Sequence, residues 1–187
     1  TNFVLMNTEG QDCGQDESLP LDYSFVDQWI IGRLQETEIA ATKAFDTYRF
    51  DIAAQTLYEF LWSEYCDWYL ELAKVQLQSG CESSQRATRR TLVRVLEVVL
   101  RLLHPIMPLI TEALWQVVAP LANAKNTDSI MLANWPVADS DKVSTTAFQK
   151  MATLQDLIGA VRNLRGEMGL APSVKAPLFI EGGQELA

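Results

Sequence analysis

One stretch, residues 92–115, constrains the fold of this chain more than any other. When residues 86–103 are placed on a helix, five of their six charged side chains, all but Arg89, share a single arc of about 80°. Leucine and valine fill most of the remaining circumference, and a helix of that kind must be covered on several sides. We therefore predict a central helix with one solvated edge, formed by Arg86, Arg90, Arg94, Glu97 and Arg101.

Two prolines turn the chain after this helix. His104 precedes Pro105, and a residue before proline is disfavoured in the α region, so the central helix should end there. Pro108 suits the first turn of a second helix, which continues past Trp115. These two helices and the rigid corner between them form the predicted core of the fold.

Further helices are predicted on both sides of this pair. Helical apolar spacing places them at about residues 24–48, 52–78 and 146–168, and a short helix end is expected at residues 1–7. Asp22 or Ser24 and then Asp51 can serve as N-caps, while Gly80 and Gly169 mark helix ends. The prediction is an all-α fold, an antiparallel bundle of about five helices. A short extended segment near residues 130–135 and a possible strand at 178–180 complete it.

Length and composition favour an ordinary globular domain. The chain has 187 residues, 48% of them apolar, and a mean hydropathy of zero. No apolar run approaches the roughly 20 residues that span a membrane. Three cysteines without a CxxC pair indicate reduced thiols in the cytoplasm. Because the chain opens with Thr1 rather than Met, we expect a fragment of a larger protein.

Charge is distributed unevenly along the chain. A net charge of −9 by itself argues against a nucleic-acid partner. Residues 1–78 hold 14 acidic and 4 basic side chains, whereas residues 79–107 hold 2 acidic side chains and 5 arginines. Any contact with a polyanion is therefore local. The arginines could bind phosphates, or they could form a solvated edge with internal ion pairs; the pattern leaves both open.

Catalytic chemistry has little support in the residues. A single histidine excludes a His-rich metal site, and His104 is better explained as a helix stop than as a general base. The stripe of Tyr58, Trp62, Tyr65 and Tyr69 favours packing with hydroxyls at a wet rim over a base-stacking platform. Arg165 falls on the apolar face of the last helix, where it needs a partner or an interface. The pattern alone predicts a helical binding or interface module.

Several ordered motifs run through most of the chain. They are Phe45-x-x-Tyr48-Arg49-Phe50-Asp51, Leu57-Tyr58-Glu59-Phe60, residues 66–74 (CDWYLELAK), residues 102–108 (LLHPIMP), Ile110-Thr111-Glu112-x-Leu114-Trp115 and Trp135-Pro136. With these motifs the chain resembles the helical anticodon-binding domain of class I aminoacyl-tRNA synthetases, in the branch specific for isoleucine, leucine and valine. Residues 27–30 (DQWI) and 161–168 (VRNLRGEM) are most similar to the valine members.

The resemblance implies a part of a ligase that joins valine to its tRNA with ATP. Residues 1–18 would be the tail of a preceding catalytic-domain helix and an acidic loop, residues 19–168 the anticodon-binding bundle, and residues 169–187 a linker toward a C-terminal region. The HIGH-like and KMSKS-like motifs of the family are absent, so this fragment alone would not be catalytic and would hold no cofactor. Valine tRNA and the catalytic domains of the same chain would be its partners. The full-length enzyme would be cytoplasmic and monomeric, without a membrane contact.

The resemblance also suggests which residues contact tRNA. Phe3, Met6 and Asn7 are candidates for base contacts, because the anticodon meets the start of the bundle in this branch. Arg33, Arg86, Arg90 and Arg94 are candidates for the phosphate backbone, and Trp135 for stacking. Two alternatives stay open: the same domain of an isoleucyl- or leucyl-tRNA synthetase, and a free-standing helical adaptor that binds protein.

Overall fold

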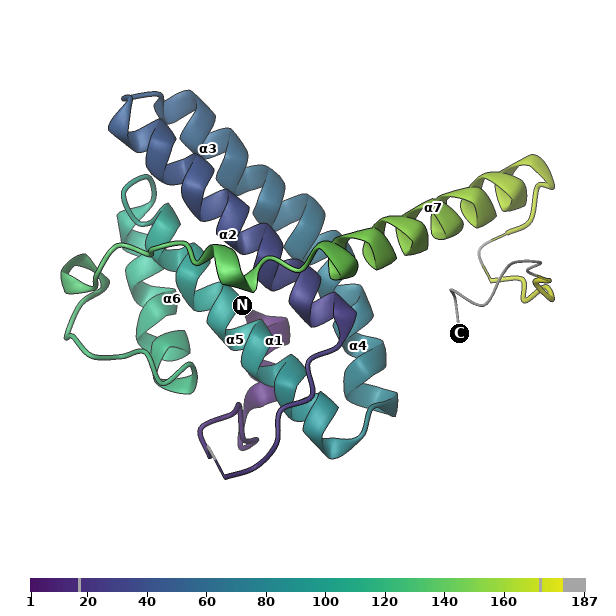
Figure 1. Cartoon of the computed structure of the whole chain (residues 1–187), viewed down its shortest axis with the longest axis horizontal. Helices are drawn as coiled ribbons and strands as arrows, with labels where there is room; N and C mark the ends of the chain where they lie inside the picture. Colours follow the sequence, from purple (N-terminus) through teal and green to yellow (C-terminus); the bar gives the residue numbers. More distant parts are fainter. Residues whose placement is uncertain (17, 172, 180–187) are drawn as a thin grey trace. The chain divides into compact units, whose positions relative to one another are not determined.

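A computed structural model describes residues 1–16, 18–171 and 173–179, and the chain divides into two compact units, Thr1–Met151 and Ala152–Ala187 (Figure 1). The described ranges contain helices and no strand, which confirms the all-α prediction. In order, the elements are α1 (Asn2–Thr8), α2 (Phe25–Asp46), α3 (Phe50–Glu59), the π-helix η1 (Phe60–Tyr69), α4 (Leu70–Ser79), α5 (Glu82–Leu103), α6 (Pro108–Leu121), the 3-10 turns η2 (Ile130–Leu132) and η3 (Ser140–Lys142), and α7 (Thr145–Glu167).

α5 lies at the centre of the first unit, as predicted. The helices α1, α2, α3, α4 and α6 all contact it. Short turns join α2 to α3 and α4 to α5, so these neighbours run antiparallel (Figure 1). The predicted solvated edge is wrong at two positions, because Arg86 and Glu97 are each only 3% exposed. The buried apolar side chains of α5 include Leu92, Val93, Val95, Leu96, Val99, Leu100 and Leu102.

The proline corner between α5 and α6 forms as predicted. α5 ends at Leu103, and Pro108 opens α6. The buried Glu97 carboxylate accepts three hydrogen bonds that compensate for its burial. The Trp115 indole N–H donates one at 2.8 Å, and the Arg101 guanidinium donates two more at 2.8 Å. A buried carboxylate with these donors holds the two helices together.

α2 begins with a capping box. Ser24 accepts a hydrogen bond from the Asp27 backbone N–H, and the Asp27 carboxylate accepts one from the Ser24 backbone in return. Asp27 is fully buried, and the Tyr69 hydroxyl donates to it at 2.6 Å. Burial raises the pKa of Asp27 although these hydrogen bonds oppose the rise. Ser24 is therefore the cap, as predicted, and Asp27 of the same capping box also links α2 to η1.

The predicted helix at residues 52–78 is interrupted by the π-helix η1. Each π turn holds more residues than an α turn, so an α-helical wheel misplaces the side chains that follow. Tyr65 and Tyr69 are buried, and the Tyr65 hydroxyl donates to the Leu92 carbonyl at 2.7 Å. The prediction of wet hydroxyls is therefore wrong for these two tyrosines. Tyr58 and Trp62 are exposed, with their rings stacked 6.3 Å apart.

Asp51 is not the N-cap of α3. The N-cap is Arg49, which makes no side-chain cap bond, and Asp51 sits in the first helical turn. Arg49 donates to the Asp51 carboxylate at 2.8 Å and 3.0 Å. The preceding Tyr48 has a φ of 57°, so the sharp turn from α2 uses backbone geometry in place of a polar cap.

The segment after α6 differs from the extended piece predicted near residues 130–135. Ile130–Leu132 form the 3-10 turn η2, and extended backbone begins only at Ala133. The Glu112 carboxylate stabilises this turn, because it accepts hydrogen bonds from the Ser129 hydroxyl and the Ile130 N–H at 2.8 Å and 3.1 Å. The chain then reaches α2 through η3. Leu178 and Phe179 form no strand, and residue 180 lies outside the described residues.

One contact near the start of α7 and one set of hydrogen bonds near its end position the helix locally. A Cβ at Gly32 of α2 would lie 2.8 Å from the Phe148 ring, so glycine permits this close contact near the start of α7. In the second unit, the Arg165 guanidinium donates to the carbonyls of Ala171 and Val174 at 2.8 Å and 2.9 Å. The partner that Arg165 was predicted to need is therefore the backbone after the helix end.

Candidate nucleic-acid interface

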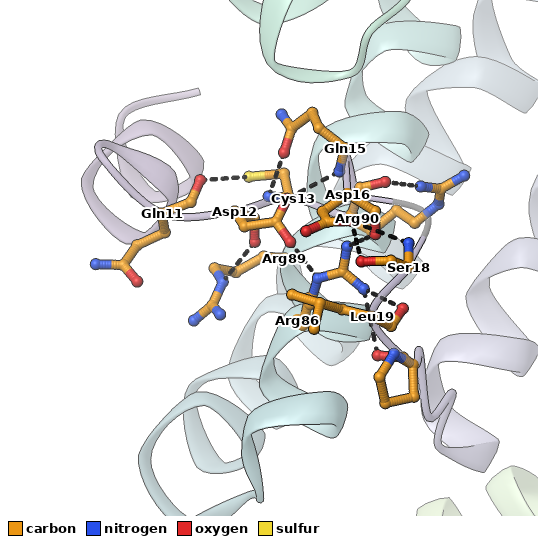
Figure 2. Close-up of polar contacts among 12 residues, drawn as sticks. Gln11, Asp12, Cys13, Gln15, Asp16, Ser18, Leu19, Arg86, Arg89 and Arg90 are labelled. Carbon is orange, nitrogen blue, oxygen red and sulfur yellow. Dashed lines mark hydrogen bonds and ion pairs between the residues drawn. The ribbon is translucent and has the colours of Figure 1, made fainter.

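Arg86 does not face solvent but fastens a loop that lies 66–74 residues earlier in the chain. Its guanidinium donates to the Asp12 carboxylate, to the Asp16 carbonyl and, at 2.6 Å, to the Leu19 carbonyl (Figure 2). Partial burial raises the pKa of Asp12, but hydrogen bonds from Arg86 and Gln15 outweigh it, and the pKa lies below its ordinary value. We call residues 12–16 and 18–20 the clamped loop.

The next arginines of α5 contact the same loop. Arg89 donates to the Asp12 carbonyl at 3.2 Å, and Arg90 donates to the Gly14 carbonyl (Figure 2). Gly14 has a φ of 81°, and a Cβ there would lie 2.7 Å from the Arg90 side chain. Only glycine allows both this backbone conformation and this approach. The arginines of α5 thus hold the loop that follows α1 on the bundle.

α1 offers a partly accessible face. Val4 and Thr8 are buried on the bundle side, whereas Met6 is 81% exposed. The Phe3 ring lies under the Lys74 ammonium group at 5.6 Å, a cation–π contact. The Asn7 side-chain NH₂ group donates to the Phe3 carbonyl at 2.7 Å. The side-chain oxygen of Asn7 takes no part in that bond. The three candidate base-contact residues therefore share one short helix, with Met6 the most accessible.

Arg33 is already neutralised by two carboxylates. It donates to Glu64 with two nitrogens at 2.6 Å and 2.9 Å and to Glu36 with a third. The hydrogen bonds that Arg33 donates to the Glu64 carboxylate raise the pKa of Arg33. A phosphate at this position would compete with both carboxylates, so the geometry favours a link between α2 and η1 over an RNA contact.

Arg90, Arg94 and Trp135 come together at one cleft. Its volume is about 480 Å³, and it lies between α2, α5 and the segment around η3. Arg94 is exposed and makes no ion pair with any residue of the described ranges. Partial burial, together with the neighbouring Arg90, lowers the pKa of Arg94. The Trp135 indole N–H donates to the Thr42 hydroxyl at 2.9 Å, which fixes the ring.

Glu38 is the buried acid of this cleft. It is 4% exposed, and burial raises its pKa to about 7 although Arg101 and Lys142 oppose the rise. The sequence pattern predicts neither a role for Glu38 nor the pairing of Glu64 and Asp12 with arginines. A polar side chain on the inner side of a predicted helix was the available signal for Glu38. The other two pairings join distant segments and have no local signal.

The described residues offer no candidate metal site. Within the described ranges, no group of three or more His, Cys, Asp or Glu side chains could hold a metal ion. His104 caps α5, and its ring nitrogen Nδ1 lies 2.8 Å from the Thr111 hydroxyl, in agreement with a structural role. Among the helices of the described residues, none combines the length and the apolar character needed to cross a bilayer.

The sequence matches the family described as the anticodon-binding domain of tRNA ligase over residues 27–180. The chain belongs to this family, which confirms the resemblance. Over 181 residues it is 72% identical to the valine–tRNA ligase of Chromobacterium violaceum, which covers 97% of this chain and 19% of that protein. The valine–tRNA ligase of Neisseria meningitidis serogroup B is 66% identical over 189 residues, or 100% of this chain and 20% of that protein. The chain thus spans about a fifth of the length of these relatives.

Proposed function

We propose that this chain binds the anticodon arm of valine tRNA as one part of a valine–tRNA ligase. The observation that carries the proposal is the family match over residues 27–180, together with relatives named valine–tRNA ligase that align along nearly the whole chain. In this proposal, attachment of valine with ATP takes place in other parts of a longer, monomeric, cytoplasmic enzyme. The proposal assigns residues 19–168 to tRNA binding, residues 1–18 to a lead-in and residues 169–187 to a linker.

The geometry supports two separate roles within the interface, base contacts on α1 and phosphate contacts on α5. Met6 with Phe3 and Asn7 on α1 offers contacts to unstacked bases, which is how proteins read RNA sequence. Arg94 and Arg90 offer phosphate contacts. Arg86 keeps the clamped loop in place and is itself too buried to contact RNA. A net charge of −9 means that such binding depends on these local groups.

Titration of labelled valine tRNA tests the proposal. We expect binding that weakens with salt and that weakens further when the anticodon bases are altered. Arg94→Gln should lower the affinity, whereas Arg49→Gln should not, because Arg49 is exposed, paired with Asp51 and outside the cleft. Equal, salt-insensitive binding to both tRNAs would instead favour a protein-binding adaptor.

A further inference from the structure

The cleft between α2 and α5 carries a positive charge that the protein does not compensate. Arg90 and Arg94 are one helical turn apart on its rim, where two like charges repel. The neighbouring cations of the cleft are already paired: Arg101 with Glu97, and Lys142 with Asp139. An anion at the rim would relieve the repulsion between Arg90 and Arg94. Glu38 lines the cleft, but its charge interacts with Arg101 and Lys142, and Glu97 is already bonded to Arg101, so neither acid neutralises the pair.

The interior of the cleft is too large and too apolar for a bare anion. Its volume of about 480 Å³ falls in the range typical of organic ligands. Ile31, Leu34 and Val98 contribute apolar surface, and Trp135 with Pro136 forms one wall. A phosphate alone would leave this surface in water. A ligand that joins an anionic group to a flat, largely apolar body fits both parts.

We propose that this cleft binds one unstacked nucleotide of the tRNA, with its phosphate at Arg90 and Arg94 and its base against the apolar wall beside Trp135. The proposal rests on the proposed function for the choice of RNA as the partner. Guanidinium groups match the geometry of phosphate oxygens, and bases stack on flat side chains. Glu38 at the interior offers a carboxyl group to the polar edge of the base.

A direct test uses small probes and nuclear magnetic resonance of the 187-residue chain. A nucleoside 5′-monophosphate should shift the Trp135 indole N–H and the Val98 methyl groups together. Inorganic phosphate should shift signals at the arginine rim but not those methyl groups, and the uncharged nucleoside should bind more weakly than the monophosphate. Absence of shifts at Val98 and Trp135 would overturn the proposal. So would tighter binding of a short acidic peptide at the same residues, which would assign the cleft to a protein partner.

Two variants separate the phosphate from the base in tRNA binding. Arg94→Gln removes one phosphate contact, so the slope of log affinity against log salt should fall by about 0.7 to 0.9. Val98→Phe fills the cleft without changing its charge, so it should weaken binding about five- to a hundredfold with an unchanged slope. Arg49→Gln is the matched control that should alter neither quantity. Urea unfolding of each variant checks that it folds.

The outcomes distinguish the cleft from the wider function. If the chain binds valine tRNA specifically but Arg94→Gln and Val98→Phe bind as the parent does, the cleft proposal is wrong and the proposed function stands. If the parent chain binds no tRNA, the proposed function fails, and the nucleotide titration still decides whether the cleft takes a nucleotide.

Discussion

Glu38 should make the stability of this protein fall as the pH rises through neutrality. Burial raises its pKa to about 7 from the ordinary 4.5 of a glutamate. The folded chain therefore binds more protons at this site than the unfolded chain between these two values, and unfolding free energy is lost as pH rises across that window. The difference between the two pKa values lowers the unfolding free energy by about 3 kcal/mol once the pH is well above 7.

Glu38→Gln removes this titration while keeping the size of the side chain. At about pH 8.5 the variant should be more stable than the parent by about 3 kcal/mol, and at about pH 5 by less than about 1 kcal/mol. Urea unfolding followed by circular dichroism at both pH values measures the difference. Asp51→Asn is the control, because Arg49 holds the pKa of Asp51 at about 2 and its carboxylate stays ionised at both pH values.

A parent protein whose stability relative to Glu38→Gln is the same at both pH values would refute the reasoning. It would mean that the carboxylate is stabilised in the folded protein by contacts as good as those with water. The electrostatic balance around Arg101, Lys142 and Glu38 would then have to be revised, because the two cations would fully offset burial.

Three more predictions concern the central helix and the clamped loop. Leu96→Ala should lower the unfolding free energy by about 2–5 kcal/mol in urea titrations, because Leu96 is 5% exposed on α5. Arg86→Gln should cost about 1–3 kcal/mol and expose the clamped loop to limited proteolysis, because it leaves the half-exposed Asp12 carboxylate and the loop carbonyls without their donor; proteolysis at the parent rate would contradict this. Gly14→Ala should cost at least about 1 kcal/mol by thermal unfolding, since φ is 81° and the new Cβ would meet Arg90, and a neutral effect would exclude that strain.

The central part of the fold could be predicted from sequence because its signals are local. The apolar circumference of α5, the stop at His104 and the start at Pro108 each depend on residues within a few positions of one another. Ser24 as the cap of α2 is of the same kind. Local steric and hydrogen-bonding rules are enough for such features.

The π-helix could not be predicted in the same way. A helical wheel assumes about 3.6 residues per turn, and η1 departs from that repeat over Phe60–Tyr69. The error appears in the tyrosines: Tyr65 and Tyr69 were expected to place their hydroxyls in water, but they lie in the core on Leu92 and Asp27. Those two acceptors belong to α5 and α2, so the π-helix aligns two polar groups with partners on separate helices.

The burial of the individual arginines on α5 could not be predicted from the helix alone. On a wheel, Arg86, Arg90 and Arg94 are equivalent, but the clamped loop reaches only part of the row. Arg86 is buried by it, Arg90 touches it through the Gly14 carbonyl, and Arg94, one turn further, remains exposed. Because the clamped loop comes from residues 12–16 and 18–20, no pattern within α5 could separate a structural arginine from one available to a ligand. Exposure increases from Arg86 through Arg90 to Arg94. We therefore expect a phosphate contact to depend most strongly on Arg94.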